Sequence, residues 1–522
     1  MKVIKKLVLV NFKRFRSLEL DFDNELIVLI GGNETGKSSV LQALDLVMSG
    51  SRSKVETIGM ESLFNADAIL EFMAGPRDVG KLPTLIVEAH LGGVVDYELN
   101  GKNHLKGGVE LDGIRLVCEP VDEYSKHIEE ILREPNSSFP FEYYAIHFRT
   151  FSGGSIHPQR RPIKHLLIDS AQINNDYATR EYTRSVYVAN ASVLERSRHG
   201  LEYRNAKSLF RKNVLKDVND KLDDYKFGVR STPKASIETD IIITEGEIPI
   251  DSKGKGRQCF IKIEFALRDR EHALDVVLLE EPENHLSHSH MRRLIDRIST
   301  AKQKQIFIAT HNSLICARLN LQKAIILSER EPSDPRSLKD LPPDTAKFFM
   351  KAPDNNVLEL ALCRKAFLVE GDAEYVLLEE LYRAHAAGGT LDRDGIHVIS
   401  VDGTSFKRYF DLAKELKIKV AAVRDNDGAY QRNCIDNYAD YASPILRVFA
   451  DPDDLRKTFE ICMYEDNKAA CEEQFAAGRK ALTVREYMLS NKTEAAFQLL
   501  THHQGRLIAP KYVQEAVAWI RQ

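Results

Sequence analysis

Residues 31–39 have the residue types and the spacing of a phosphate-binding loop. They read GGNETGKSS, directly after the apolar run 26–30, and fill the pattern G-x-x-x-x-G-K-[ST]. In this pattern glycines let backbone N–H groups surround phosphates, the lysine reaches the β and γ oxygens, and the serine hydroxyl binds Mg²⁺. The sequence therefore predicts an ATP site with contacts from Gly31, Asn33, Gly36, Lys37, Ser38 and Ser39.

Paired acids follow a second apolar run. Residues 274–286 read LDVVLLEEPENHL, in which Glu280 and Glu281 end the run 276–279. In P-loop ATPases one such acid holds the Mg²⁺ shell, and an acid or amide positions the attacking water. We therefore assign Glu280 to the metal and Glu281 to the water.

A histidine closes a third apolar run, within IFIATHNS at residues 306–313. A histidine at the end of such a strand can contact the γ-phosphate, whereas a purely structural histidine is the alternative. His311 follows a P-loop and a Glu-Glu pair in the order expected for an ATPase. We therefore predict that it takes part in ATP hydrolysis.

Another group of acids lies in the C-terminal part of the chain. One apolar run ends on Glu370, and the segment after it carries Glu374, whereas a later run leads to Asp425 and Asp427. A strand that reaches the surface before an acidic helix start would explain the first two residues without any chemistry. If the two runs are neighbouring parallel strands, however, the carboxylates meet at one sheet edge. Such hard oxygen ligands suit Mg²⁺ or Mn²⁺.

Alternating patterns of strand and helix would position these acids. Strand patterns at 366–371, 396–403 and 418–428 alternate with helix patterns at 373–385 and 405–417. This alternation predicts a parallel sheet with its chemistry at the carboxyl ends of the strands.

The whole chain is expected to be α/β, with five segments. Residues 1–162 form the P-loop half of an ATPase, 163–227 a helical insertion, and 228–330 the other ATPase half. Residues 331–363 are rich in proline and charge and predict a linker, and 364–522 form the second α/β domain. The insertion has apolar residues at helical spacing and charges of both signs, so solvated helices without a partner are an alternative to an interface.

Composition describes an ordinary globular protein. The chain has 522 residues, is 43% hydrophobic and 29% charged, and carries a net charge of −4. This charge excludes a wholly basic surface but not a local DNA-binding groove. Seven scattered cysteines without a C-x-x-C pair fit a reducing cytoplasm, and no apolar run reaches membrane-spanning length.

The motifs EEPENHL and ATHNS resemble the ABC-type ATPases of the SMC and recombination-repair group, and most closely the OLD (overcoming lysogenization defect) family. Glu280 stands where ABC transporters usually carry aspartate, as OLD-like proteins often do. The patterns E-G-x-x-E and D-x-D, with Gly403 between them, resemble the Toprim domain of OLD nucleases. The resemblance implies an ABC/SMC-like P-loop ATPase with a helical dimerisation insertion, followed by a Toprim domain.

The resemblance also implies further site residues. In that family a signature segment of one subunit completes the nucleotide site of its partner, and DSKGKGRQ offers Ser252, Gly254 and Gly256. Its lysines depart from the compact Ser-Gly-Gly form, and a basic glycine-rich turn is the alternative. A late acid and a lysine of OLD nucleases correspond to Glu460 and Lys492, although Lys492 could also be a solvated surface lysine.

The implied nuclease centre holds two divalent metals about 4 Å apart, which activate water and stabilise the leaving oxygen of a phosphodiester. Lysine near the scissile phosphate would stabilise developing charge. The expected ligands are Glu370, Glu374, Asp425, Asp427 and Glu460, with Ser38 and Glu280 binding a separate Mg²⁺ beside ATP.

The resulting prediction is an ATP-binding and ATP-hydrolysing, Mg²⁺- or Mn²⁺-dependent DNA endonuclease, homodimeric or larger, that nicks or cuts DNA in antiphage defence, with ATP either activating or restraining cleavage. OLD-like proteins act alone, beside a helicase-like protein as in Gabija systems, or as retron effectors, so a retron nucleic acid, a reverse transcriptase or a helicase-like protein is a candidate partner. The alternative is an ATP-dependent DNA-binding repair or sensor scaffold with an inactive Toprim module. A topoisomerase is less well supported, because no length remains for a strand-passage domain.

Overall fold

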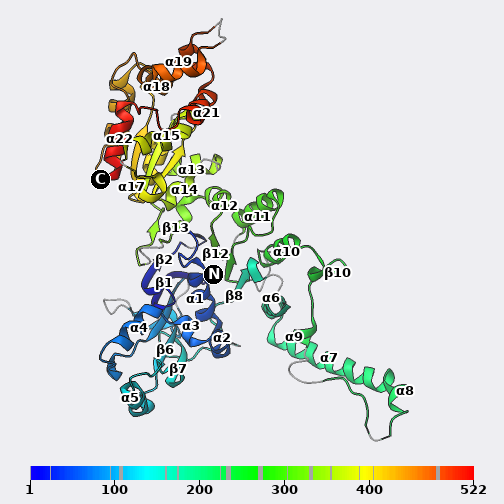
Figure 1. The fold of residues 1–522 in the computed structure, drawn as a ribbon. Coiled ribbons are helices and arrows are strands. Elements are labelled where there is room, and N and C mark those ends of the chain that lie inside the picture. Colours follow the sequence, from blue (N-terminus) through cyan, green and yellow to red (C-terminus); the bar gives the residue numbers. More distant parts are fainter. Residues whose placement is uncertain are drawn as a thin grey trace. The chain divides into compact units, whose positions relative to one another are not determined.

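The structure of this chain, a computed structural model, describes residues 2–23, 25–93, 96–104, 110–158, 161–172, 176–223, 225–230, 237–267, 274–301, 304–328, 333–352, 356–386, 388–403, 405–477 and 482–522. Two compact units are present (Figure 1). The first unit comprises Met1–His311 and Leu327–Pro335, and the second comprises Asn312–Ile326 and Arg336–Gln522.

An antiparallel sheet opens the first unit. Its strand order is β2-β1-β4-β6-β5, with β7 also paired to β6. Buried and exposed residues alternate along much of β2 and β7, as expected for a sheet with only one face in the core. The strands are β1 (Val3–Phe12), β2 (Phe15–Asp21), β4 (Leu85–Gly92), β5 (Asn100–Gly101), β6 (Leu111–Pro120) and β7 (Tyr144–Thr150).

A parallel sheet carries the ATPase motifs. Its strands are β3 (Leu26–Ile30), β12 (Gln305–Thr310), β11 (Val276–Glu280) and β8 (His165–Asp169), in that spatial order. The apolar runs that predicted β3, β11 and β12 are almost wholly buried, as expected for central strands of a parallel sheet. Since the strands are parallel, Glu280 lies opposite Asp169 and Ala309 at their carboxyl ends.

The strand β8 was not expected, because the segment 163–227 was predicted to be a helical insertion throughout. The apolar residues 166–168 lie in the sheet beside β11, and the helices begin only afterwards. Pairing with β11 therefore makes these residues a strand, although their sequence pattern predicted a helix. The helices of this segment are α6 (Asp176–Asn190), α7 (Val193–Asn213) and α8 (Lys216–Asn219) (Figure 1).

Helix α1 (Lys37–Ser49) packs against strands of both sheets and is buried along most of its length. Asp45 on this helix forms an ion pair with Lys54 and is hydrogen-bonded to His165 of β8, which ties the helix to the parallel sheet. The other elements of this unit are α2 (Arg52–Ile58), α3 (Met60–Leu63), α4 (Ala66–Ala74), α5 (Ser125–Arg133), α9 (Ile237–Asp240), β9 (Thr244–Glu245), β10 (Ile248–Pro249), α10 (Lys255–Leu267) and α11 (His288–Thr300).

The second unit is built on a four-stranded parallel sheet. Its order is β16-β15-β17-β18, so β15 lies beside β17 as the carboxylate cluster requires. The strands are β15 (Lys365–Val369), β16 (Ile396–Ser400), β17 (Lys419–Val423) and β18 (Leu446–Phe449). Their helices are α15 (Asp372–His385), α16 (Leu391–Asp394), α17 (Phe406–Glu415), α18 (Phe459–Asp466), α19 (Lys468–Phe475), α20 (Val484–Ser490), α21 (Lys492–His503) and α22 (Lys511–Arg521).

The segment 331–363, predicted as a linker, is more ordered than its proline and charge content suggested. Its described residues include β14 (Arg336–Ser337), α13 (Pro343–Lys351) and α14 (Val357–Leu362). Phe349 and Leu360 are fully buried, because an apolar face packs these helices onto the second unit. This unit also contains α12 (Ser313–Arg318) and β13 (Ala324–Ile326).

Membrane insertion finds no support among the helices. Within the part of the chain that the structure describes, no helix has both the length and the apolar composition needed to cross a bilayer.

Gln305 joins the two sheets of the first unit. Its side chain is fully buried, accepts a hydrogen bond from the Ile4 amide at 2.7 Å, and donates to the carbonyls of Ile4 and Asp23 at 2.8 Å each. We expect Gln305→Leu to lower the free energy of unfolding by roughly 2 kcal/mol, because these backbone groups lose their partner in a dry interior.

Urea titration followed by circular dichroism measures this change. Gln498→Leu is the matched control, because Gln498 is only partly buried and donates to Glu494 of its own helix. Equal effects of the two substitutions would contradict the role of Gln305 as a link between the sheets.

Candidate functional site

The P-loop joins β3 to α1 and is shaped by two glycines. Gly36 has φ 97°, a left-handed conformation that side chains other than glycine rarely adopt, and a Cβ there would collide with Phe15. A Cβ on Gly31 would collide with Thr35. Lys37 donates to the carbonyl oxygens of Gly31 at 2.9 Å and of Gly32 at 2.8 Å, so its ammonium lies inside the loop.

The other predicted contacts of this loop are accessible. Asn33 and Ser38 are exposed, and Ser39 is partly buried at the start of α1. The Ser38 hydroxyl is hydrogen-bonded to the carboxylate of Glu280, so the two predicted Mg²⁺ ligands of the ATP site lie together. Burial and the nearby Asp169 and Glu281 carboxylates raise the pKa of Glu280, although the bond from Ser38 opposes the shift.

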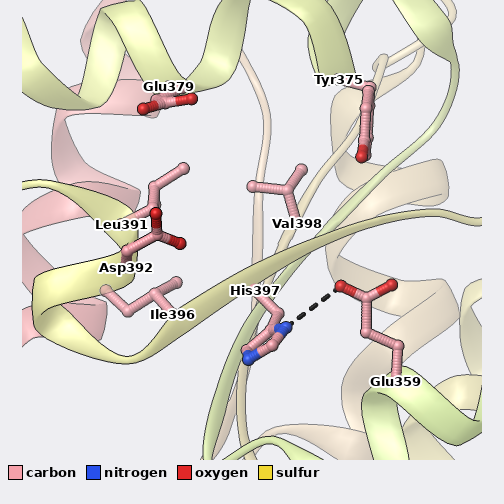
Figure 2. A pocket seen from close by; sticks show the side chains of 8 residues that line it. All are labelled: Glu359, Tyr375, Glu379, Leu391, Asp392, Ile396, His397 and Val398. Carbon is pink, nitrogen blue, oxygen red and sulfur yellow. Dashed lines mark hydrogen bonds and ion pairs between the residues drawn. The ribbon is translucent and has the colours of Figure 1, made fainter.

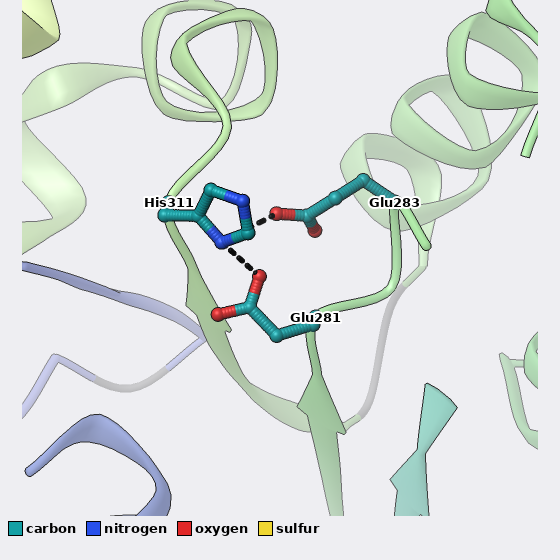
Figure 3. Close-up of side chains that lie close together, drawn as sticks. All are labelled: Glu281, Glu283 and His311. Carbon is teal, nitrogen blue, oxygen red and sulfur yellow. Dashed lines mark ion pairs between the residues drawn. The ribbon is translucent and has the colours of Figure 1, made fainter. Parts of the chain in front are cut away.

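Glu281 and His311 meet at the ends of β11 and β12 (Figure 3). His311 Nδ1 lies 2.5 Å from Glu281 Oε2 and 3.8 Å from Glu283 Oε1. Glu281 has φ 44°, and its amide donates to the Ala309 carbonyl at 2.8 Å, which fixes this uncommon backbone conformation. The imidazole is therefore placed to orient the carboxylate that we assign to the attacking water.

Glu283 was missed by the sequence reasoning, although it stands two residues after Glu281 in the same motif. It is buried and accepts a hydrogen bond from the Thr310 hydroxyl at 2.5 Å. Burial raises its pKa, and the Glu281 carboxyl raises it further. Two carboxyls and one imidazole, with ligand atoms within 4.8 Å of one another, are also donors that a divalent metal accepts.

The predicted signature segment precedes and enters α10. Ser252 ends a short 3₁₀ turn, Gly254 follows, and Gly256 lies in the first helical turn, where a Cβ would collide with the His285 carbonyl oxygen. The basic side chains of Lys253 and Arg257 form ion pairs with Glu245. The lysine that departs from the Ser-Gly-Gly form is thus held by an acid of the same unit.

The acids of the second unit gather at the carboxyl edge of its sheet. Glu370 and Asp425 follow the adjacent strands β15 and β17, and the Asp425 amide donates to Glu370 Oε2 at 3.3 Å. Two helix starts supply Glu460 and Lys492, whose Oε2 and Nζ atoms lie 3.0 Å apart. They enclose a pocket of about 270 Å³ lined by Glu370, Gly371, Asp372, Ala373, Glu374, Gly403, Asp425, Glu460, Lys492 and Thr493.

Proton binding in this pocket is strongly perturbed. Burial raises the pKa of Glu374 to about 8, and Asp425 and Glu460 add repulsion. Burial, Glu460 and Glu370 raise the pKa of Asp425 to about 7. Lys492 is also partly buried, which disfavours its charge, but the surrounding carboxylates raise its pKa overall. The pocket thus has an excess of negative charge that a bound cation would neutralise.

Asp427 lies apart from this pocket. It does not belong to the lining residues, and its Oδ2 lies 3.2 Å from the Nη2 of Arg424. Arg424 was not singled out from the sequence, although it directly precedes Asp425. Only the folded loop reveals that this arginine is buried next to the acids.

Another pocket of about 200 Å³ lies on the β16 side of the same unit (Figure 2). Glu359, Glu379 and Asp392 line it, and Glu359 Oε1 lies 3.0 Å from the Nδ1 of His397. None of the residues predicted to bind metal or nucleotide lines this pocket. Substitutions of its acids therefore serve as controls for substitutions of the acids at the sheet edge.

Three family models match the chain. An AAA ATPase domain matches residues 1–88, and an AAA domain described as "putative AbiEii toxin, Type IV TA system" matches residues 147–317. The Toprim domain of overcoming lysogenization defect (OLD) protein-like proteins matches residues 362–427. This last match includes Glu370, Glu374, Asp425 and Asp427 and ends before Glu460 and Lys492.

Curated relatives match parts of the chain. The DNA double-strand break repair Rad50 ATPase of Methanococcus maripaludis is 26% identical over 146 residues, which are 27% of this chain and 13% of that protein. The DNA replication and repair protein RecF of Colwellia psychrerythraea is 24% identical over 199 residues, 38% of this chain and 44% of that protein. The chain thus spans less than half the length of these relatives.

Solved structures match each part at low similarity. The C-terminal region of the OLD protein of Xanthomonas campestris pv. campestris is 22% identical, with 30% of this chain and 92% of that chain covered and a TM-score of 0.24. An SMC head bound to the C-winged helix domain of ScpA is 13% identical, with 65% of this chain and 99% of that chain covered and a TM-score of 0.35.

The domain matches confirm the predicted fold class and the resemblance. The chain is α/β, with ATP-binding AAA domains followed by an OLD-like Toprim domain.

For ATP hydrolysis, we expect Glu281→Gln to lower kcat by about 100-fold, as loss of a group that activates water does. Glu283→Gln should lower kcat by roughly 10-fold without weakening ATP binding, because Glu283 positions Thr310 and Glu281 rather than the nucleotide.

Phosphate release and binding of a fluorescent ATP analogue measure the two effects. Glu264→Gln is the control, since Glu264 pairs with Arg297 on α11 and lies outside the cluster. Full ATPase activity of Glu283→Gln would contradict the assignment.

The pH dependence of stability follows from the raised pKa values of Glu374 and Asp425. In the unfolded chain both carboxyl groups lose their protons near pH 4. In the folded metal-free protein, Glu374 keeps its proton up to about pH 8 and Asp425 up to about pH 7. The folded state therefore binds more protons than the unfolded state in this window, and the free energy of unfolding falls as pH rises.

Calorimetry of the metal-free chain should accordingly show a lower Tm at about pH 8.5 than at about pH 6, and Mg²⁺ should raise Tm more at the higher pH. Glu374→Gln should reduce this pH dependence, whereas Glu379→Gln should not. The same slope in both variants would exclude the pocket as its source.

Proposed function

We propose that this OLD-like protein, in which AAA ATPase domains precede an OLD-like Toprim domain, is an ATP-gated, Mg²⁺- or Mn²⁺-dependent DNA endonuclease of antiphage defence. The observation that carries the proposal is the pocket where five carboxylates, four of them predicted metal ligands, and Lys492 converge at the carboxyl edge of a parallel sheet. The position of this pocket agrees with the general rule for open α/β sheets, whose ligands bind beyond the carboxyl ends of the strands.

The donor chemistry of this pocket fits a hard divalent cation. Glu370, Glu374, Asp425 and Glu460 supply only carboxylate oxygens, the ligands that Mg²⁺ and Mn²⁺ prefer. Burial, and then repulsion between the carboxylates, raises the pKa values of Glu374 and Asp425, and a bound cation would favour their ionised forms. When bound, the cation would lower the pKa of a coordinated water and neutralise charge on the phosphodiester.

The protein's own groups divide the remaining tasks. Lys492 lies at the pocket wall and would add positive charge beside the scissile phosphate. Glu460 holds the Lys492 ammonium in place through their ion pair. The backbone amide of Phe459 donates to Asp425 Oδ1 at 2.7 Å, which fixes the orientation of that carboxylate.

The nucleotide site would control this chemistry through a second copy of the chain. Helix α7 buries none of its residues and exposes Leu194, Leu201 and Leu209, so we assign this helix to a homodimer interface. The partner's signature segment, around Ser252 and Gly254, would then complete the ATP site. The antiphage role, a cytoplasmic location and a second defence component are parts of this proposal that rest on the OLD resemblance.

Plasmid cleavage by the purified protein tests the proposal. With Mg²⁺ or Mn²⁺ we expect nicked or linear DNA, and we expect Glu370→Ala to abolish it, because the pocket loses a cation ligand at the sheet edge. Glu379→Ala is the matched control, since this acid lies on the same helix as Glu374 but lines the other pocket (Figure 2).

Plasmid cleavage by Lys37→Ala, measured with and without ATP, shows whether nucleotide binding activates or restrains the nuclease. Faster cleavage than wild type in the presence of ATP would mean that nucleotide binding restrains the nuclease, and slower cleavage would mean that it activates the nuclease. ATP-dependent DNA binding without cleavage under any metal would contradict the proposal and favour a repair or sensor scaffold.

A further inference from the structure

Arg424 is a buried cation in the loop that carries two of the predicted metal ligands. Only 4% of its surface is exposed, although arginine is among the residues least often buried. It directly follows β17 and precedes Asp425. A buried guanidinium requires partners for its five N–H donors, and those partners show what the charge does.

The guanidinium lies between two carboxylates. Its Nη2 is 3.2 Å from Asp427 Oδ2, and its Nε is 4.0 Å from Glu370 Oε2. The remaining donors bind neutral groups: Nε donates to the Asp425 carbonyl at 2.9 Å, and Nη1 donates to the Tyr438 hydroxyl at 3.0 Å and to the Asn433 carbonyl at 3.4 Å. These bonds hold the arginine side chain in one position.

Asp427 is correspondingly turned toward Arg424. Its residue has φ 53°, and its amide donates to the Lys457 carbonyl at 3.1 Å. About half of its side chain is exposed, and it takes no part in lining the pocket where Glu374, Asp425 and Glu460 meet. The D-x-D pair is therefore split, with one acid in the pocket and the other beside the arginine.

We propose that Arg424 supplies a permanent positive charge between Glu370 and Asp427, in the place of one of the two divalent cations that such an acid set would otherwise bind. The inference rests on the proposed function, because it concerns the cation requirement of the same site. A guanidinium stays charged at any pH at which the protein is folded, so this charge does not depend on metal concentration.

The position of the guanidinium disfavours a second cation beside Glu370 and Asp427. Such a cation would lie within a few ångströms of Arg424, where repulsion in a partly buried site is strong. Arg424 is thus a positioning residue that orients Glu370 and Asp427.

Mn²⁺ binding tests this inference without reference to cleavage. Electron paramagnetic resonance of the full chain, without nucleotide and with Glu280→Gln and Glu283→Gln to remove the two candidate metal sites of the first unit, should count one Mn²⁺ per chain. Adding Glu374→Gln should weaken this binding by about 10-fold or more. Adding Asp427→Asn should change it by less than about 3-fold, because Asp427 pairs with Arg424 instead.

Removal of the buried charge gives the complementary result. Arg424→Gln should gain a second Mn²⁺, and circular dichroism should report a folded protein. Arg447→Gln is the matched control, since Arg447 on β18 lies over the Phe449 ring and should leave the count at one.

Two Mn²⁺ ions in the wild-type Toprim site, or equal losses of affinity in Asp427→Asn and Glu374→Gln, would overturn the inference and leave the proposed nuclease intact. No bound Mn²⁺ in any protein would overturn both.

Discussion

Repulsion between carboxylates at the ends of parallel strands is the constraint on which both units depend. Parallel strands bring their carboxyl ends to one sheet edge, and here β11 ends in Glu280, whereas β15 and β17 lead to Glu370 and Asp425. Asp425 is buried and Glu280 and Glu370 are half-buried, so their charges are weakly screened. Each edge can therefore be stable with ionised acids only if hydroxyls, cationic side chains or bound cations lie next to them.

The two units meet this constraint with different groups. In the first unit the Ser38 hydroxyl bonds Glu280, and His311 lies against Glu281, so the groups that offset the acids are those expected to contact ATP and its Mg²⁺. In the second unit Lys492 and Arg424 each take part of the charge of the cluster. Burial, together with the neighbouring carboxylates, raises the pKa values of Glu374 and Asp425.

Uncommon backbone conformations mark the same places. Glu281 and Asp427 both adopt positive φ, which costs free energy for residues other than glycine and persists only where neighbours fix it. The Ala309 carbonyl fixes the first and the Lys457 carbonyl fixes the second. In each case the turn directs a carboxylate away from the strand direction, toward His311 in one unit and toward Arg424 in the other.

Local patterns in the sequence determined much of this protein. The P-loop, the Glu-Glu pair and the strands β3, β11, β12, β15 and β17 could be predicted, because glycine spacing and buried apolar runs are properties of a few consecutive residues. Only the tertiary structure decided which distant segments pair. It placed β8 in the ATPase sheet, joined Glu460 to Lys492 and separated Asp427 from Asp425 by means of Arg424. These contacts depend on strand order and packing between segments far apart in the chain, which no local periodicity encodes.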